Sequence, residues 1–292
     1  MNKQEFNTFL SDHEIIISDG ATGTNLIARG LPRGKTAEHW LLEEPDKIQR
    51  LHHDFIQSGS KIILTSTFGG SKIRLKQSNL DHAFERINQL GVQVAKKATK
   101  GTTSLVAGSI GPLGEMLKPL GLLEVEDAKN FFRDQAKILV DAGSDLIVIE
   151  TQFDTSEAIA AIEGVREVSE VALICSFSFD RGIKTMMGVS PTKFATAVKD
   201  YDLSALGINC GKSIEDNEKC LDELTGATNL PIWFKPNAGL PIIDQNGDAT
   251  YSLSPEDMGG FAKDWPSMGA KIIGGCCGTS PAHLASIAAS LN

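Results

Sequence analysis

The chain has 292 residues, of which 41% are hydrophobic and 22% are charged, and these proportions are ordinary for a globular protein. Its formal net charge of −9 creates a field that repels phosphate backbones, which argues against nucleic acid as a partner. No apolar stretch approaches the roughly 18 residues of a membrane helix, and the N-terminal segment lacks the apolar core of a signal peptide. We therefore expect a cytoplasmic protein that does not associate with membranes.

Eight short apolar runs, many of them rich in β-branched residues, recur along the chain. Each has the length of a strand. Most are apolar nearly throughout, which is typical of strands that are covered on both faces of a parallel sheet. The runs are residues 14–19, 61–67, 104–110, 145–150, 171–178, 204–209, 230–235 and 271–275.

Helical patterns lie between these runs, and the clearest are residues 45–59, 126–144, 156–169, 254–269 and 280–291. The last two begin with Ser-Pro, which is a good N-cap followed by the first helical position. Alternation of eight strands with helices predicts a (β/α)8 TIM barrel, with an open doubly wound sheet as the alternative. We expect a single domain over residues 1–292.

Polar residues cluster where the predicted strands end. In a barrel of this class the active site is built at the C-terminal ends of the strands, so these residues should meet on one face. The strand ends carry Asp19, residues 65–70, residues 108–115, Glu150, residues 176–180, Asn209 with Cys210, residues 235–239 and residues 274–279.

Three of the five cysteines, Cys210, Cys276 and Cys277, lie at these ends. Three thiolates with one open position are typical of a catalytic zinc site, and such an electron-rich centre suits a thiol substrate as the fourth ligand. Flanking glycines permit the φ angles that would turn both adjacent thiols inward. The alternatives are that the cysteines are small buried hydrophobes, or that the adjacent pair forms a strained disulfide. Cys175 and Cys220 are predicted to be structural.

The chain resembles the zinc-dependent homocysteine S-methyltransferases over essentially its whole length. The resemblance is carried by "DGATGT", "LTSTFGG", "GSIGPLGE", "VIETQFDT", "GINCG", "KPNAG" and "GAKIIGGCCGTSPAHL", in the family's order and spacing. It implies a (β/α)8 barrel that binds Zn²⁺ through Cys210, Cys276 and Cys277. It also implies that the thiol of L-homocysteine binds this zinc as a thiolate and attacks a methyl donor to give methionine.

The same resemblance assigns substrate-binding residues. Asp19 and Glu150 match acidic positions near the homocysteine amino group, and Asn209 and Asn237 are expected to orient the substrate or a loop. Beyond the zinc-activated substrate thiolate, no catalytic residue is predicted. Many relatives have an acidic residue where Lys235 stands, so the resemblance assigns that position no role.

The methyl donor is less closely defined, because relatives use methylcobalamin, S-methylmethionine, S-adenosylmethionine or betaine. The stretches "FGGSKIRLK" and "KTMMG" resemble the free-standing bacterial betaine–homocysteine methyltransferase-like branch, so we expect glycine betaine. The alternative donors are methylcobalamin, S-methylmethionine and dimethylsulfoniopropionate. Aromatic faces bind a quaternary ammonium, and the candidates are Trp40, Phe68, Phe153 and Phe179.

Two hypotheses of other classes remain at this point. One is a non-catalytic zinc–thiolate protein that stores or senses the metal. The other is a metal-free barrel enzyme in which the cysteines are structural. The expected partners are L-homocysteine and a small methyl donor, and the sequence is also compatible with a homo-oligomer.

Overall fold

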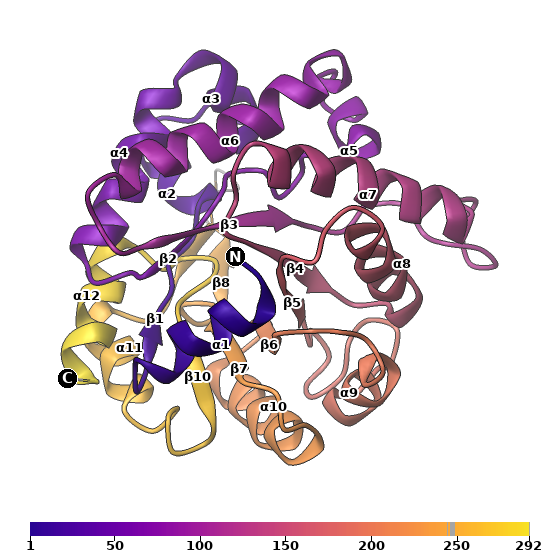
Figure 1. Ribbon diagram of the computed structural model, residues 1–292. Helices are drawn as coiled ribbons and strands as arrows, with labels where there is room; N and C mark the ends of the chain where they lie inside the picture. The colour runs from indigo at the N-terminus through magenta and orange to yellow at the C-terminus, as the bar shows by residue number, and fades with distance from the viewer. Residues whose placement is uncertain (244, 246–248, 292) are drawn as a thin grey trace.

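The computed structural model describes residues 1–243, 245 and 249–291, and its main sheet is a closed parallel barrel. Eight strands pair in the order β1-β10-β7-β6-β5-β4-β3-β2. The two end strands also meet, because Ser18 pairs in parallel with Ile62, and the Asp19 amide donates to the Ile62 carbonyl at 3.0 Å. This closure confirms the predicted (β/α)8 barrel and excludes the open doubly wound sheet (Figure 1).

Every predicted apolar run contributes one strand to the barrel. The observed strands begin or end within a few residues of the predicted runs, which is the usual uncertainty of strand boundaries. They are β1 (Ile16–Ile17), β2 (Ile62–Leu64), β3 (Leu105–Ile110), β4 (Leu146–Gln152), β5 (Ala172–Phe177), β6 (Ala205–Cys210), β7 (Ile232–Pro236) and β10 (Ala270–Ile273).

Helices surround the barrel (Figure 1). The main ones are α4 (Pro45–Gln57), α6 (Phe84–Thr99), α7 (Val125–Asp141), α8 (Thr155–Arg166), α9 (Pro191–Val198), α10 (Ile214–Ala227), α11 (Pro255–Ala262) and α12 (Pro281–Ser290). Each of the five clearest helical patterns overlaps one of them. Further elements are α1 (Lys3–Ser11), α2 (Gly23–Ala28), α3 (Ala37–Glu43), α5 (Lys72–Lys76) and η1 (Asp81–Ala83). A hairpin of β8 (Pro241–Ile243) and β9 (Ala249–Tyr251) was not predicted.

Helix capping fixes the start of α12 directly after the loop that follows β10. Ser280 is its N-cap, Pro281 is its first helical residue, and the Ser280 amide donates to Nδ1 of His283 at 3.2 Å. Nε2 of His283 contacts the Leu253 carbonyl at 3.0 Å, so the same ring ties the helix start to the segment before α11. His283 is therefore a capping residue of α12.

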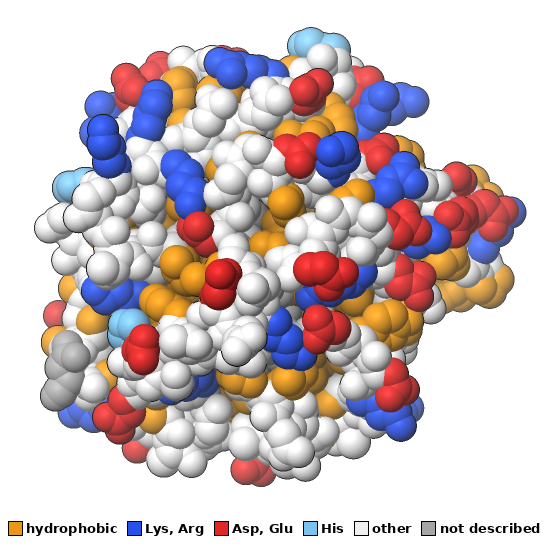
Figure 2. All heavy atoms as spheres, viewed as in Figure 1, with side chains coloured by type: hydrophobic (Ala, Val, Ile, Leu, Met, Phe, Trp, Pro, Cys, Tyr) orange, Lys and Arg blue, Asp and Glu red, His pale blue; other side chains and the backbone are white. Residues whose placement is uncertain are grey.

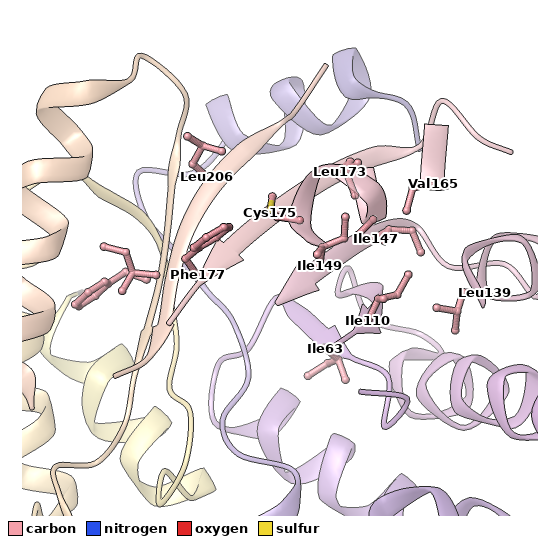
Figure 3. Close-up of a cluster of buried hydrophobic side chains, with 14 of the residues drawn as sticks. Ile63, Ile110, Leu139, Ile147, Ile149, Val165, Leu173, Cys175, Phe177 and Leu206 are labelled. Carbon is pink, nitrogen blue, oxygen red and sulfur yellow. The ribbon is translucent and has the colours of Figure 1, made fainter. Parts of the chain in front are cut away.

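Two apolar layers hold the fold together. The barrel interior contains side chains such as Phe6, Leu64, Val148 and Trp233, and they are almost fully buried. The second layer lies between the strands and the surrounding helices, where Ile63, Ile147, Leu173 and Leu206 face outward (Figure 3). Burial on both faces is the reason that these strands are apolar nearly throughout.

Helix α1 lies across the N-terminal end of the barrel, where Phe6 and Leu10 join the interior cluster (Figure 1). The side chains on that face of the molecule carry charges of both signs that are interspersed (Figure 2). Across the described part of the chain, every helix is too short or too polar to cross a bilayer. The N-terminal end is thus closed by apolar packing, which leaves the opposite end for the strand-end residues.

Candidate active site

The three cysteines predicted to bind zinc meet at the C-terminal end of the barrel. Cys210 is the last residue of β6, whereas Cys276 and Cys277 lie in the loop that follows β10. Their Sγ atoms all lie within 4.8 Å of one another, and no other such group of His, Cys, Asp or Glu is found in the described ranges. The sulfurs of Cys210 and Cys276 are 2.8 Å apart, well beyond the ~2.05 Å of a disulfide, and all five cysteines are free.

Unusual backbone angles bring these sulfurs together. Cys210 has φ +59°, a left-handed conformation that is strained for a residue with a Cβ, and Gly211 continues the turn at φ +77°. On the other side, the Cys276 amide donates to the Pro236 carbonyl at 2.8 Å. Gly278 has φ +83°, and a Cβ at this position would lie 2.2 Å from Cγ of Tyr251. Glycine is therefore required where the second loop passes the Tyr251 ring.

The pKa values of the three thiols shift in different directions. Hydrogen bonds from Cys210 and then Cys276 lower the pKa of Cys277 to about 3, and a hydrogen bond from Tyr251 acts in the same direction. The hydrogen bond with Cys276 raises the pKa of Cys210 above its usual value. At neutral pH the cluster thus holds a thiolate on Cys277 that neighbouring groups stabilise.

The donor set fits a zinc ion. With Zn–S bonds of about 2.3 Å, the sulfurs of a tetrahedral site stand roughly 3.8 Å apart, which lies within the 4.8 Å limit of this cluster. The shorter Cys210–Cys276 pair, at 2.8 Å, would have to open by roughly 1 Å to span a metal. A zinc ion held by three protein sulfurs would have room for one further ligand from the cavity.

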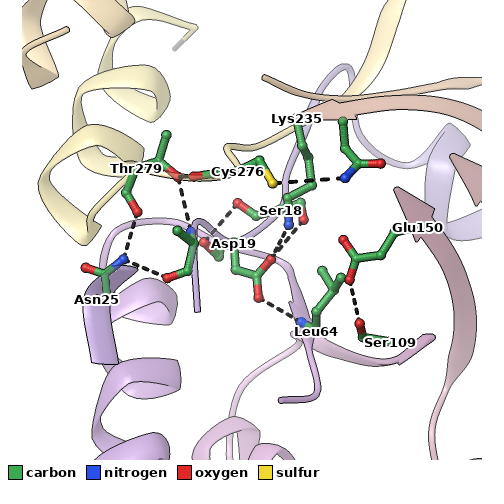
Figure 4. A network of polar contacts seen from close by, with 12 residues as sticks. Ser18, Asp19, Asn25, Leu64, Ser109, Glu150, Lys235, Cys276 and Thr279 are labelled. Carbon is green, nitrogen blue, oxygen red and sulfur yellow. Dashed lines mark hydrogen bonds and ion pairs between the residues drawn. The ribbon is translucent and has the colours of Figure 1, made fainter. Parts of the chain in front are cut away.

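Two buried carboxylates lie in the same mouth (Figure 4). Asp19 accepts from Nζ of Lys235 at 2.6 Å and from the Leu64 amide at 2.8 Å. Glu150, within β4, accepts from Oγ of Ser109 at 2.5 Å. Burial raises the pKa of both carboxyls, and Lys235 opposes this effect at each. The carboxylates predicted to face the substrate amino group are thus present, but Asp19 already has a cationic partner.

Asn209 contacts the thiols directly. Its Nδ2 points toward the sulfurs of Cys210 and Cys276, at 3.7 and 4.0 Å, and donates to Oγ1 of Thr151 at 2.7 Å. Asn237 instead donates to the Gly211 carbonyl at 2.8 Å, and its Oδ1 is buried without a partner among the described residues. Asn209 is therefore placed to orient the cysteines, whereas Asn237 shapes the loop after β6.

A cavity of about 530 Å³ connects the cysteine cluster with the segments around α2, α3 and α5. We call the part of the lining at the strand ends, with Glu150, Lys235 and the three cysteines, its inner end. We call the part around α3 and α5, with Phe68, Arg74 and Glu38, its outer end. The volume is typical of a small-molecule site, and its polar groups stand at both ends.

The four aromatic candidates for donor binding lie in different places. Phe68 lines the cavity and is 37% exposed. Trp40 is buried beneath Nζ of Lys47, which lies 4.3 Å from the centroid of its ring, and Phe179 is buried beside Phe177. Phe153 is half-buried and, like Trp40 and Phe179, lies outside the cavity lining. Of the four, Phe68 is the one that the fold brings to the cavity.

Sequence reasoning missed three contributors to the site. Lys235 was left without a role, although a lysine at the end of an apolar strand was a signal, because burial of an unpaired ammonium is costly. Tyr251 comes from the unpredicted hairpin strand β9, and no local pattern linked it to Cys277. Arg74 lies on the five-residue helix α5, which is too short for a periodic signal.

The closed barrel and the site together define a (β/α)8 protein with a cluster of three cysteines, able to hold a metal ion, at the mouth of a small-molecule cavity. A family model described as homocysteine S-methyltransferase matches residues 16–291. The chain belongs to the homocysteine S-methyltransferase family.

Similarity to individual proteins agrees with this assignment. The metallated form of the homocysteine methyltransferase MmuM from Escherichia coli superposes with a TM-score of 0.82 at 28% identity, covering 97% of this chain and 98% of that one. Methionine synthases from Mycobacterium tuberculosis (strain ATCC 25618 / H37Rv) and Mycobacterium leprae (strain TN) are 28% and 26% identical over 99% of this chain. The chain spans about a quarter of the length of these two relatives, since the match covers 26% of each.

Proposed function

We propose that this chain transfers a methyl group from a small onium donor, with glycine betaine favoured, to the thiol of L-homocysteine, and that residues 1–292 form one homocysteine-binding domain. The observation that carries the proposal is the convergence of Cys210, Cys276 and Cys277 at the inner end of a cavity that also exposes Glu150. A thiol that also carries an amino group matches this combination of a thiophilic centre and a buried carboxylate. The E. coli relative, described as a homocysteine methyltransferase, supports homocysteine as the acceptor.

A zinc ion on the three cysteines would supply a site that accepts a thiol as its fourth ligand and lowers the thiol's pKa. The positioning of the cysteines and the binding of the substrate are carried out by side chains of this chain. Asn209 orients two of the sulfurs, and Glu150 binds the substrate's ammonium. Proximity of sulfur and methyl carbon then supplies much of the rate, because a bimolecular step becomes effectively unimolecular.

The reaction balances without a further reactant. The homocysteine sulfur forms a bond to the methyl carbon of betaine as the bond between that carbon and nitrogen breaks. The electron pair of the broken bond stays on nitrogen, so the products are methionine and the neutral amine dimethylglycine. A zinc ion held by Cys210, Cys276 and Cys277 would lower the pKa of the thiol so that its proton is lost to solvent before the transfer, and for this reason no protein base is assigned.

The outer end of the cavity supports a small donor that carries both a cationic and an anionic group. Phe68 provides an aromatic surface, and the carboxylate of Glu38 is buried beside it, where it accepts from the Gly69 amide at 2.7 Å. The half-buried guanidinium of Arg74 lines the same end without a hydrogen bond or ion pair to another described residue. Betaine, S-methylmethionine and dimethylsulfoniopropionate all combine an onium centre with a carboxylate, whereas methylcobalamin far exceeds a cavity of about 530 Å³.

Placement in the betaine-dependent branch is part of this proposal, as is a cytoplasmic location. A zinc-storage or zinc-sensing protein remains the candidate of another class, and the cavity beside the thiols argues against it, because storage requires no space for an organic ligand. A metal-free enzyme is disfavoured by the packing of three sulfurs, since apolar burial alone does not require them to meet.

A donor screen tests the proposal. The zinc-loaded protein is incubated with L-homocysteine and, in separate reactions, with glycine betaine, S-methylmethionine, dimethylsulfoniopropionate or methylcobalamin, and methionine is quantified. We expect the highest turnover with betaine. Turnover only with another donor would retain the acceptor and replace the donor, and no methionine from any donor would contradict the assignment as an enzyme.

A further inference from the structure

Lys235 is a buried cation at the centre of the candidate site. It lies in β7, its side chain is 4% exposed, and its Nζ is 2.6 Å from Oδ1 of Asp19. The same ammonium lies 5.2 Å from the centroid of the Trp233 ring, and the residue lines the cavity beside Glu150. A lysine is almost never this buried unless its ammonium is paired with an anion, and here that anion is Asp19.

Both oxygens of Asp19 accept hydrogen bonds, whereas Lys235 uses only part of its donor capacity. Oδ1 of Asp19 accepts from Lys235, and its Oδ2 accepts from the Leu64 amide at 2.8 Å. An ammonium has three N–H donors, and Lys235 uses one of them in a hydrogen bond to a described residue. Two donors of this cavity-lining residue are thus without a hydrogen-bond partner among the described residues and are available to a ligand.

The charges near the thiols point to a zwitterionic ligand. Glu150 presents a carboxylate whose one hydrogen bond within the described chain comes from Ser109. Lys235 presents an ammonium, and both residues line the inner end of the cavity (Figure 4). An α-amino acid carries the complementary pair of charges on one carbon atom, so a single ligand can engage both side chains while its sulfur reaches the cysteine cluster.

We propose that Lys235 binds the α-carboxylate of the acceptor, opposite the α-ammonium that the proposed function assigns to Glu150, and that Asp19 acts as a positioning residue that holds Lys235. The inference rests on the proposed function, because it assigns both ends of the amino-acid thiol in that same site. Lys235 and Glu150 would then restrict the acceptor to thiols that carry both charged groups, as homocysteine does.

This assignment is tested by the binding of three thiols to the cobalt(II)-substituted protein. No methyl donor is added, and the dissociation constants are obtained from the sulfur-to-cobalt charge-transfer absorption. The thiols are L-homocysteine, 3-aminopropane-1-thiol, which lacks the carboxylate, and 4-mercaptobutanoate, which lacks the amino group. In Lys235→Met we expect roughly 10–100-fold weaker binding of the two carboxylate-bearing thiols, the scale of a lost charge-assisted hydrogen bond. Binding of 3-aminopropane-1-thiol should change by less than roughly threefold.

Further variants isolate the role of Lys235. Glu150→Gln should show the complementary pattern, with loss confined to the two thiols that carry an amino group. The double variant Asp19→Asn/Lys235→Met removes the pair without leaving a buried unpaired carboxylate, and it should reproduce the pattern of Lys235→Met. The matched control is Lys219→Met, at an exposed position on α10.

Two outcomes would overturn the inference, and they are distinguishable. If the Lys235 variants weaken all three thiols equally while cobalt content and fold are retained, Lys235 supports only the structure of the site. If the unmodified protein binds cobalt but none of the thiols, the proposed function itself fails and the inference fails with it.

Discussion

Asn209 and Thr151 form a two-bond clamp across the barrel mouth. The Thr151 amide donates to Oδ1 of Asn209 at 2.9 Å, and Nδ2 of Asn209 donates to Oγ1 of Thr151 at 2.7 Å. Thr151 at the end of β4 and Cys210 at the end of β6 both have left-handed backbones, with φ of +61° and +59°. The clamp holds two strained strand ends together at the point where the first sulfur enters the site.

This clamp predicts a role for Asn209 in metal affinity. Asn209→Ala removes both bonds to Thr151 and the amide that faces the sulfurs of Cys210 and Cys276. We expect zinc affinity to fall roughly 10–100-fold, as is typical for loss of a partner that orients a ligand. Competition with a chromophoric chelator measures the affinity. Asn130→Ala on the outer helix α7 serves as the control, and unchanged affinity in Asn209→Ala would refute the role.

The cysteine cluster predicts that the thiols differ in whether zinc binding requires them. Alanine at Cys210, Cys276 or Cys277 should each reduce bound zinc from about one ion per chain to a trace, because a two-sulfur site is incomplete. Cys220→Ala is the matched control, since that thiol is buried within α10 away from the cluster. Zinc content by elemental analysis and methionine formation are measured together. A Cys210→Ala protein that retains both zinc and activity would show that the mechanism is wrong.

The position of Arg74 predicts how donors are discriminated. Arg74→Met should lower kcat/KM roughly 10–100-fold for dimethylsulfoniopropionate, which carries a carboxylate, and much less for trimethylsulfonium, which lacks one. Arg86→Met, at an exposed position of α6, serves as the control. Equal losses with the two donors would indicate that Arg74 does not contact the donor carboxylate.

His52 predicts a specific sensitivity of stability to acid. Both ring nitrogens are buried without a partner in the described structure, and burial lowers the pKa of His52 from 6.5 to about 4. As the pH falls from about 6.5 toward 4, the unfolded chain binds a proton at His52 that the folded chain does not bind. The free energy of unfolding therefore decreases, by about 3 kcal/mol over the whole interval, and above this interval His52 causes no loss.

The difference between His52→Leu and the unmodified protein isolates this effect from other titrating groups. Urea unfolding is measured at several pH values between 7.5 and 4.5 for both proteins. The stability gained by His52→Leu relative to the unmodified protein should grow as the pH falls. His53→Leu, one residue away on the exposed face of α4, should show no such growth. Parallel pH profiles for His52→Leu and the unmodified protein would contradict the assignment.

The barrel was predictable because each strand is buried on both faces, and this burial leaves a local signal in the sequence. The same holds for the strand-end positions of Cys210, Cys276 and Cys277, since all parallel strands end at one face of the barrel. By contrast, the hairpin strand β9, which carries Tyr251 to Cys277, is short and exposed and has no apolar period.

By itself, the sequence determined which strands exist and that three thiols stand at the end of the barrel where chemistry occurs. Only the tertiary structure decided how closely the sulfurs approach, because that depends on the left-handed turn at Cys210 and on the close passage of Gly278 by Tyr251. The tertiary structure also brings Asp19 together with Lys235, which lies 216 positions away in the chain. A pairing between residues this far apart depends on barrel closure, and no local pattern encodes it.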